Sequence, residues 1–553
     1  MKIKKLIIII GVILMLLTVI DLAAYADCTA IVVGKDASVD GSVMTSHTGC
    51  CSNFRVHVVP EQTFEKGAMA PVYYGIQDLT SADYRDYGEV IGEIPQVEKT
   101  YGYFHDGYPH LNKHQLGIGE TTLSQKNELR VYKDVCKQIM TIEQAEIFAH
   151  QRAKTAREAI EVITSLIEKY GFLPSCCGKA PDGECLLIAD TKEAWILEVF
   201  SIGKNDWDPE SGEIGALWAA QRVPDDHVKI VPNCSTIREI DLSDPDYYMA
   251  SENYMQVAID LGLYDPDSGK PFVWCEAYAP PPTEGNMGRI WLFHTTHAPN
   301  LRKYHYFDPL SYYPFSIKPE KKLAVQDVIA FQRSYFKDTI LDMTRDLDWM
   351  VEGPDGKCVK SPMATPWPTK DMRELLDITW HRRVSQGGYG CVVQLRDWLP
   401  DPIGGLMWFY VENQYMSMYA PIYAGVKEIN PLYKTMDNNK FSEDSIRWVF
   451  EFVDTLMSLK FQEADKDLHA MRDPLEAELF AKQAEIEDEA LKLYKDDPDK
   501  ANNFLTDYCW SRMDEIAELY RDLRYVLITK YCNNKQGVSQ GYRGDDFEYA
   551  WPR

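Results

Sequence analysis

The sequence lacks the short motifs that mark the commonest catalytic and cofactor sites. It has no C-x-x-C pair, no H-E-x-x-H, no G-x-S-x-G elbow and no G-x-x-x-x-G-K-[ST] loop. These absences argue against a zinc ribbon or thioredoxin motif, a zinc peptidase, a serine hydrolase of the elbow type and a P-loop nucleotide site. No low-complexity run is present either, and 45% apolar residues are typical of a folded globular protein.

Basic residues are too few to balance the acidic ones. The chain has 58 Lys and Arg against 84 Asp and Glu, which gives a formal net charge of −26 at pH 7. Binding to phosphate groups needs clustered Lys and Arg that dominate the local electrostatic field. The sequence therefore predicts no nucleic-acid partner, and we attribute the acidic charge to solubility.

Long hydrophobic runs are also absent, with one exception at the start of the chain. Three lysines within residues 2–5 precede the apolar segment 6–20, and Ala24-Tyr25-Ala26 follows it. This order is the anatomy of a secretory signal peptide, which we place at residues 1–26 with cleavage near Ala26. No other segment approaches the roughly 18 apolar residues of a membrane helix. We therefore expect a secreted or periplasmic product without stable membrane insertion.

Thirteen cysteines fit an exported chain, because oxidising compartments permit disulfides. Without Cys28 an even number remains, and both disulfides and free thiols stay open for them, since parity gives no connectivity. The vicinal pairs 50–51 and 176–177 are expected to reach separate partners, because adjacent cysteines seldom meet disulfide geometry. Cys509 and Cys532 are expected to pair with other segments rather than with each other.

Cys28 becomes important once the leader is removed. Cleavage after Ala26 leaves Asp27 in front of it, and a further step, self-cleavage or an aminopeptidase, must remove that residue. An N-terminal cysteine carries a thiol nucleophile and an α-amine that can act as its base. Reference pKa values of about 8.5 for the thiol and about 7.7 for the amine suit this proton transfer. The alternatives are a half-cystine or a buried thiol; a lipid anchor is disfavoured because Asp27 is charged.

The hydrophobic pattern alternates between β-rich and helical blocks. Apolar runs typical of strands occur at 30–33, 56–59, 116–118, 184–190, 193–200, 215–220, 390–395 and 405–411. Helical spacing occurs at 141–170, at 322–340 and from residue 442 onwards. Thr141-Ile-Glu-Gln144 predicts a capping box, and Gly171 is expected to close that helix. Because the blocks do not form regular βαβ units, we predict an α+β fold with helices covering antiparallel sheets.

Five stretches spread over the chain carry a family resemblance. They are residues 28–42 (CTAIVVGKDASVDGS), 116–122 (LGIGETT), 222–233 (RVPDDHVKIVPN), 341–346 (LDMTRD) and 394–408 (QLRDWLPDPIGGLMW). In this order they resemble peptidase family C69, the dipeptidase A type, a branch of the N-terminal nucleophile (Ntn) hydrolases. The resemblance implies a four-layer αββα sandwich, self-processing that exposes Cys28, and hydrolysis of short peptides, mainly dipeptides. Related cysteine-type members cleave other linear amides, including bile salts and penicillins.

The resemblance also implies positions for site residues. Asn233 falls where the family's sandwich places an oxyanion-stabilising Asn, and Glu120 with Thr121 falls where another active-site strand ends. Losing an oxyanion donor typically costs about 2.7–4 kcal/mol of barrier. Asn233 also lies in an Asn-Cys-Ser sequon, whose alternative meaning is a glycosylated surface. The apolar run 228–231 before it favours the buried catalytic role.

One stretch departs from the family. Many N-terminal cysteine hydrolases carry an Arg and an Asp shortly after the hairpin of the nucleophile, whereas residues 45–53 here are TSHTGCCSN. Asn53, His47 and Arg55 are the candidates to replace those partners.

A dipeptidase must recognise a free ammonium and a free carboxylate. From charge type and motif position, we expect Glu120 to bind the ammonium and Arg396 to bind the carboxylate in the bidentate mode that Arg favours. The alternative for each residue is an ordinary ion pair at a strand end.

Histidine pairs are the remaining candidates for metal ligands. His294 with His297, and His110 with His114, lack a matching carboxylate at helical spacing, so we expect core or surface histidines. The sequence predicts neither a metal nor another cofactor.

The sequence thus predicts a secreted cysteine dipeptidase, with a catalytic domain at residues 28–439 and a helical C-terminal extension at 440–553. Small peptides are its expected partners, and a homo-oligomer stays open. The alternatives are a related linear-amide acylase and a catalytically silent, disulfide-braced binding protein.

Overall fold

The computed structural model describes residues 28–175, 182–353, 355–379, 381, 383–384 and 387–532. The predicted signal peptide, Asp27 and the vicinal pair at 176–177 lie outside these residues. None of the described helices combines the length and the apolar character needed to cross a membrane.

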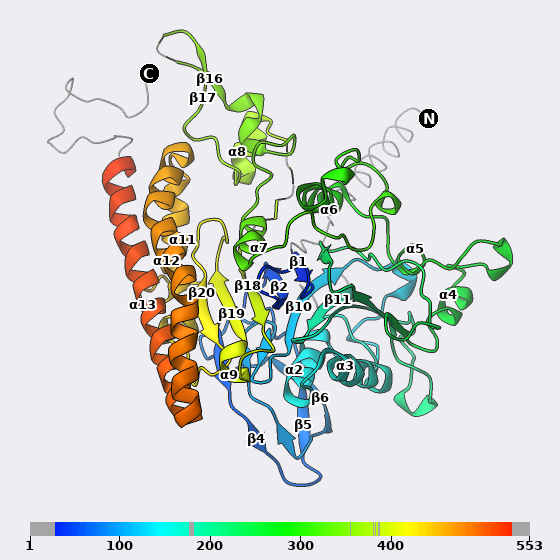
Figure 1. The fold of residues 1–553 in the computed structure, drawn as a ribbon. Helices are drawn as coiled ribbons and strands as arrows, with labels where there is room; N and C mark the ends of the chain where they lie inside the picture. The colour runs from blue at the N-terminus through cyan, green and yellow to red at the C-terminus, as the bar shows by residue number, and fades with distance from the viewer. Residues whose placement is uncertain are drawn as a thin grey trace, which may run out of the picture.

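Two antiparallel sheets form the centre of the molecule (Figure 1). The first contains, in sheet order, β14 (Val228–Val231), β1 (Ala30–Val33), β2 (Val43–Gly49), β18 (Tyr389–Leu395), β19 (Leu406–Val411) and β20 (Ala420–Tyr423). The second contains β15 (Tyr248–Ala250), β13 (Leu217–Val223), β12 (Ala194–Phe200), β11 (Gly183–Ala189), β10 (Gly117–Leu123), β9 (Leu111–Asn112), β8 (Tyr103–His105) and β3 (His57–Val59). Together with the helices they confirm the α+β class.

The two sheets lie against each other through β2, β10 and β11. The hydroxyl of Thr45 on β2 donates to the carbonyl of Leu187 on β11 at 2.9 Å. Gly119 on β10 permits the closest approach, because a Cβ there would lie 2.2 Å from the carbonyl oxygen of Ser46. This close packing sets the ends of β2 and β10 beside each other.

Helices cover both sheets. α2 (Ile142–Arg152) and α3 (Ala156–Tyr170) lie on the side of the second sheet, whereas α6 (Glu284–His297) and α7 (Val325–Gln332) contact the first (Figure 1). The short helices are α4 (Gln256–Asp260), α5 (Trp274–Tyr278), α8 (Lys370–Leu376), α9 (Asp401–Gly404) and α10 (Pro431–Lys434). Small hairpins pair β5 (Met69–Tyr74) with β6 (Glu89–Pro95), β4 (Gln62–Thr63) with β7 (Lys99–Thr100) and β16 (Met350–Glu352) with β17 (Cys358–Lys360).

The predicted helix at 141–170 is two helices. Thr155 begins the second one with a complete capping box to Glu158, so the chain turns between α2 and α3. Thr141 caps α2 as predicted, but the side chain of Gln144 accepts a hydrogen bond from the backbone of Tyr73 at 3.0 Å. The side chain of Gln144 therefore makes a tertiary contact and does not complete the predicted capping box.

The helix predicted at 322–340 is shorter than its apolar spacing suggested. α7 ends at Gln332, and Phe336 and Asp338 adopt left-handed backbone angles, with φ of 64° and 62°. Such angles interrupt a right-handed helix. The strands predicted at 184–190 and 193–200 are present as β11 and β12, which form a hairpin with Asp190 accepting from the Lys192 amide at 2.7 Å.

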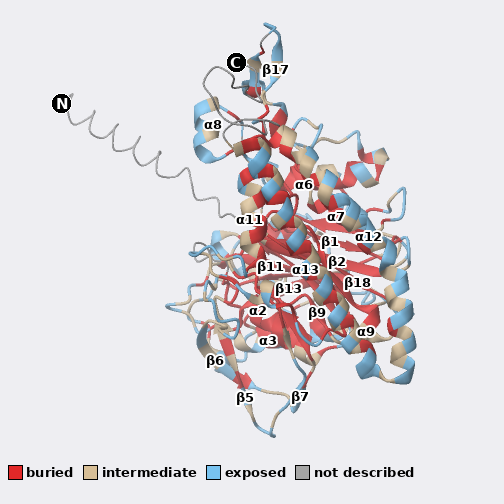
Figure 2. Cartoon of the chain, turned by 90° about the vertical axis from the view of Figure 1, so that its left-hand side faces the viewer, coloured by how far each residue is buried: buried red, intermediate tan, exposed pale blue. Residues whose placement is uncertain are grey.

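Three helices follow the sheets at the C-terminal end: α11 (Ile446–Met457), α12 (Phe461–Asp496) and α13 (Pro498–Tyr531). α13 packs on β20, and one hydrophobic cluster contains Val449 and Tyr520 of these helices together with Trp408 of β19. Figure 2 shows buried strands in the interior and helices whose residues alternate between buried and exposed. The boundary at residue 440 stays a prediction.

An ion pair joins α12 to the end of α7. Arg333 donates two hydrogen bonds to the carboxylate of Glu476, both at 2.6 Å, and each side chain is only 12% exposed. Arg333 also donates to the carbonyl oxygens of Gln414 and Ser417. The guanidinium thus ties the helical extension to the chain after β19.

We expect Glu476→Gln to destabilise the protein by about 3 kcal/mol, because it leaves the buried charge of Arg333 without its counter-charge. The urea unfolding midpoint, followed by circular dichroism, measures this. Glu478→Gln on the same helix is the matched control, since Glu478 is exposed and pairs with Lys482. Equal shifts of the midpoint in both variants would contradict this role.

Candidate functional site

One end of the first sheet brings Cys28 and Asn233 together. β1 and β14 pair antiparallel with Ala30 opposite Val231, and continuing this register places Cys28 opposite Asn233. Both residues are buried, Cys28 with 3% and Asn233 with 6% of its surface exposed.

Asn233 is held in one orientation by β10. Its backbone N–H and its side-chain Nδ2 both donate to the hydroxyl of Thr121, at 3.1 and 3.0 Å, and Nδ2 also donates to the carbonyl of Thr122 at 3.0 Å. Asn233 has a left-handed φ of 56°, a conformation that Asn tolerates better than most residues. Thr121 and Asn233, two of the candidate site residues, are therefore in direct contact.

A residue that the sequence did not reveal connects these groups. Arg289 on α6 is fully buried, and its Nη1 donates to the Cys28 carbonyl at 2.7 Å, to the Thr29 hydroxyl at 2.9 Å and to Asn233 Oδ1 at 3.1 Å. Its Nη2 donates to the carbonyl of Pro232 at 3.1 Å. The guanidinium therefore fixes both strand ends. No local pattern around Arg289 distinguishes it in the sequence from a surface helix arginine.

Glu120 lies next to Thr121 but on the other face of β10, since side chains alternate along a strand. Its Oε1 accepts from the hydroxyl of Thr122 at 3.1 Å, and its carboxyl interacts electrostatically with that of Glu184, which lies opposite Thr122 on β11. The ring Nδ1 of His47 lies 3.7 Å from Oε2. Glu120 and Glu184 thus form a buried acidic pair on β10 and β11 of the second sheet.

Burial and neighbouring charge shift the titration of this region. The pKa of the Cys28 thiol is raised well above its usual value by a hydrogen bond to Cys50, by burial and by the nearby carboxyl of Glu120. Burial raises the pKa of Glu120 to about 8 and that of Glu184 well above its usual range. Cys28 in this setting is a thiol, so its use as a nucleophile requires a base.

The structure does not bring Arg396 to these residues. Cys28 lies at the Gly49 end of β2, whereas Arg396 follows the other end of β18, where Leu395 pairs with Val43. Arg396 donates to the carbonyls of Ile403 and Gly404, both at 2.9 Å, and forms an ion pair with Glu487. This is the alternative considered from the sequence, an ion pair at a strand end.

The three candidates to replace the family's Arg and Asp lie in other environments. Arg55 donates to Asn53 Oδ1 at 2.9 Å and to the carbonyl of Ser81 at 2.7 Å. His47 Nδ1 contacts the carbonyl of Glu120 at 2.9 Å, between the sheets. Among the described residues, the guanidinium that contacts Cys28 is that of Arg289.

Nine cysteines of the described residues form no disulfide bond, although the sequence left both states open for them. Cys28, Cys136, Cys185, Cys234, Cys275, Cys358, Cys391, Cys509 and Cys532 are reduced. The expectation that Cys509 and Cys532 pair with other segments is therefore not met.

The histidine pairs do not assemble into a metal site in the described part of the chain, where no group of three His, Cys, Asp or Glu has a suitable arrangement. His110 Nδ1 contacts the carbonyl of Ile118 at 2.9 Å, and His294 is buried.

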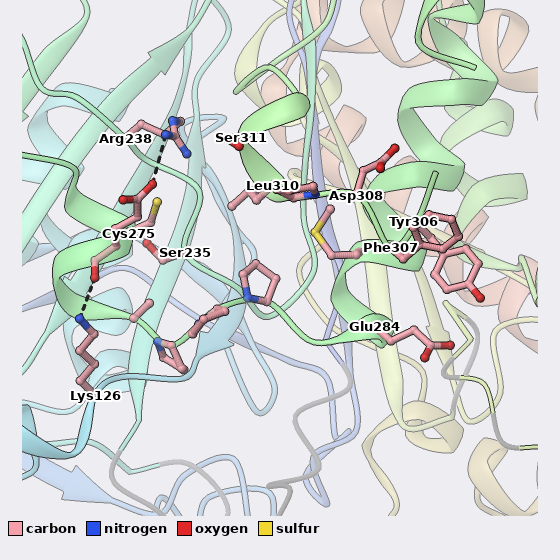
Figure 3. Close-up of a pocket in the computed structure, with 17 residues that line it drawn as sticks. Lys126, Ser235, Arg238, Cys275, Glu284, Tyr306, Phe307, Asp308, Leu310 and Ser311 are labelled. Carbon is pink, nitrogen blue, oxygen red and sulfur yellow. Dashed lines mark hydrogen bonds and ion pairs between the residues drawn. The ribbon is translucent and has the colours of Figure 1, made fainter. Parts of the chain in front are cut away.

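A pocket of about 690 Å³ opens beside α6 (Figure 3). Lys126 Nζ donates to the Glu276 carbonyl at 2.7 Å and Arg238 lies 3.3 Å from the Glu276 carboxylate, so two cations border one side. Figure 3 shows Glu284, Phe307 and Asp308 on the other side. Glu284 and Met287 of α6 line this pocket, and Arg289 of the same helix contacts Cys28.

Comparison with known proteins agrees with this arrangement. The model of peptidase family C69 matches residues 27–473, so the match begins one residue before Cys28 and includes both sheets. The chain belongs to peptidase family C69. It is 21% identical to "Probable dipeptidase B" of Streptococcus pyogenes serotype M1 over 93% of this chain and 95% of that protein. It is 24% identical to "Probable dipeptidase" of Salmonella dublin, over 75% and 84%, and 23% identical to "Dipeptidase A" of Lactobacillus helveticus, over 76% and 80%.

In this C69 chain we expect Glu120→Gln to flatten the pH dependence of stability. A carboxyl that titrates near 8 when folded and near 4.3 when unfolded keeps a proton on the folded state between these values. The free energy of unfolding therefore falls as pH rises from about 4 to about 8. Glutamine mimics the protonated form, so this slope decreases. Urea unfolding at several pH values measures it, with the exposed Glu276→Gln as control; an unchanged slope in Glu120→Gln would refute the assignment.

Proposed function

We propose that this chain is a secreted cysteine dipeptidase, which cleaves short peptides through Cys28 after processing frees its α-amine. The observation that carries the proposal is the contact of Arg289 with both the Cys28 carbonyl and Asn233 Oδ1. This buried arginine fixes the strand ends that carry Cys28 and Asn233. Amide hydrolysis needs both a nucleophile and an oxyanion donor, and these two residues are the candidates. The match to a peptidase family and the relatives named as dipeptidases support the same reaction class.

The reaction begins with the thiol of Cys28. Its raised pKa means that a base must take the proton as the sulfur attacks the peptide carbonyl carbon. The freed α-amine of the same residue accepts this proton directly or through one water, and then gives it to the leaving amine as the C–N bond breaks. Water hydrolyses the thioester that remains and restores the thiol.

The negative oxygen of the tetrahedral intermediate is assigned to Asn233. Both hydrogens of its Nδ2 donate within the protein, to Thr121 and to the carbonyl of Thr122. We propose that the substrate oxygen replaces Thr122 as one acceptor. Arg289 holds Oδ1 and thereby prevents the amide from rotating as this exchange takes place.

We assign the ammonium and the carboxylate of the substrate to two separate sets of charged residues. Glu120 and Glu184 are buried together near Cys28, and a substrate ammonium would supply the positive charge that permits both carboxyls to ionise. Lys126 and Arg238 in the pocket beside α6 replace Arg396 as candidates for the carboxylate. A dipeptide with a blocked amine should therefore be a poor substrate.

The layer order supports an αββα Ntn sandwich as the finer description of the fold. α2 and α3, the second sheet, the first sheet, and α6 with α7 follow one another through the molecule. The proposal of secretion rests on the leader at residues 1–26. Assays of N-acyl amino acids beside dipeptides distinguish the acylase alternative from a dipeptidase.

We expect the exported, active protein to begin at Cys28, and Cys28→Ala to lose turnover by about 10³-fold or more. Intact mass and N-terminal peptide mapping identify the first residue, and dipeptide hydrolysis measures turnover. Cys136→Ala, which removes a partly buried thiol whose Sγ lies 3.9 Å from the carbonyl oxygen of Gln138, is the control and should keep native activity. Full activity in a protein that begins with Asp27 would refute the proposal.

Arg289 and Arg396 offer a matched pair of buried arginines. We expect Arg289→Lys to lower kcat by about 10²-fold, because lysine cannot hold Cys28, Asn233 and Pro232 at once. Arg396→Lys should leave kcat and KM for dipeptides unchanged and lower only stability, because its contacts are with Glu487 and α9. A raised KM in Arg396→Lys would restore Arg396 as a substrate-binding residue.

A further inference from the structure

The row of side chains that holds Asn233 continues along the second sheet to Glu198. Thr121 lies opposite Cys185 on β11, and Cys185 lies opposite Glu198 on β12. Residues directly opposite one another in antiparallel strands project from the same face of a sheet. Thr121 contacts Asn233, which follows β14 of the first sheet, so Glu198 lies on the face directed to this chain segment.

Glu198 binds the residues that follow Asn233 in the chain. Its Oε1 accepts from the backbone N–H of Thr236 at 2.7 Å and from that of Ile237 at 3.2 Å. The hydroxyl of Ser235 donates to its Oε2. The second sheet therefore fixes this segment at two points, once at Asn233 and once just after it.

Glu198 also links this segment to α5. It is fully buried, and Nε1 of Trp274 donates to its Oε2 at 2.9 Å. The backbone N–H of Trp274 donates to the carbonyl of Arg238 at 2.9 Å, so the side chain and the backbone of one residue join the two segments. All the hydrogen bonds described for Glu198 are ones that it accepts, as a carboxylate does. Its carboxylate is thus the common acceptor of a loop and a helix.

The backbone of Asn233 makes this support important. Its φ of 56° is left-handed, and a residue other than glycine keeps such a conformation only where the surrounding structure requires it. Thr121 and Arg289 hold the side chain of Asn233. The direction in which the chain leaves Asn233 depends on the following residues, and Glu198 fixes those through their backbone N–H groups.

We propose that Glu198 is a positioning residue for the oxyanion donor: it holds residues 235–237 so that Asn233 keeps its left-handed conformation and directs Nδ2 to the substrate oxygen. The proposal rests on the proposed function of Asn233. Glu198 does not touch the substrate and acts through Asn233. A glutamine at this position places an N–H donor against the donors that the carboxylate accepts, among them the indole of Trp274, so Glu198→Gln loosens the segment.

The test compares Glu198→Gln with Glu168→Gln in the exported protein with its mature N-terminus. Glu168 on α3 is the matched control, because its Oε1 likewise accepts from an indole N–H, that of Trp218 at 2.7 Å. We expect Glu198→Gln to lower kcat for dipeptides by about 10-fold to 10²-fold and to leave KM within about twofold, because a misplaced donor stabilises the transition state less. Glu168→Gln should change kcat by less than about twofold.

A double-mutant cycle with Asn233→Ala separates positioning from a general weakening of the fold. Because Glu198 acts through Asn233, Glu198→Gln should lower kcat by less than about twofold once Asn233 is alanine. Hydrogen–deuterium exchange resolved to single amides gives a second readout that does not depend on turnover. The backbone N–H of Asn233 should exchange about tenfold faster in Glu198→Gln, although its own acceptor, the hydroxyl of Thr121, is unchanged.

Two kinetic results would overturn the positioning role: native kcat in folded Glu198→Gln, or an equal fold loss of kcat with Asn233 present and with Asn233→Ala. Should Glu198→Gln fail to fold, Ser235→Ala, which removes one donor and keeps the carboxylate, enters the same cycle with the same criteria. If the native protein is active and either result is found, only the positioning role fails.

If the native protein hydrolyses no peptide, the proposed function fails and the exchange rate at Asn233 decides the inference. Faster exchange in Glu198→Gln but not in Glu168→Gln means that the positioning of Asn233 stands without the dipeptidase activity. An exchange rate that equals the native one overturns the positioning role as well.

Discussion

The buried guanidinium of Arg289 is the constraint on which the site depends. A charge without access to water is stable only when its hydrogen-bond donors are satisfied, and here the Cys28 carbonyl, Asn233 Oδ1 and the Pro232 carbonyl accept from it. Three segments that are far apart in the sequence are therefore fixed with respect to one another. The register of β1 and β14 brings Cys28 and Asn233 opposite each other, and Arg289 locks that arrangement.

A second constraint comes from two carboxyl groups buried under the same sheet end, whose pKa values burial raises. Glu120 and Glu184 share a low-dielectric environment, and the carboxyl of Glu120 helps to keep the Cys28 sulfur protonated. In the mechanism proposed above, the α-amine that processing frees is the base that activates this thiol. The raised pKa of the Cys28 thiol is the reason why the proposed mechanism needs a base.

Much of the fold could be predicted because local patterns determined it. The hairpin of β11 and β12, the cap at Thr141 and the stop at Gly171 follow from alternation, hydroxyl capping and glycine. The site residues were harder to predict from the sequence, because the charge of a residue does not indicate at which end of a strand it lies. Arg396 was assigned to the substrate on charge alone, whereas Arg289, the arginine that contacts Cys28, lies on a helix with no motif and is placed there by tertiary packing.

Arg289 and Arg396 lie at opposite ends of the first sheet and have different contacts. At one end of the first sheet, Arg289 binds the oxygens that frame a nucleophile. At the other, Arg396 is neutralised by Glu487 of α12, and the same helix supplies Glu476 to neutralise Arg333, which contacts the chain after β19. A cation that already has a buried carboxylate partner has little attraction left for a substrate carboxylate, and separating the pair would be costly. The helical extension therefore serves to fix β18, β19 and β20, so that the opposite strand ends keep the spacing that Cys28 requires.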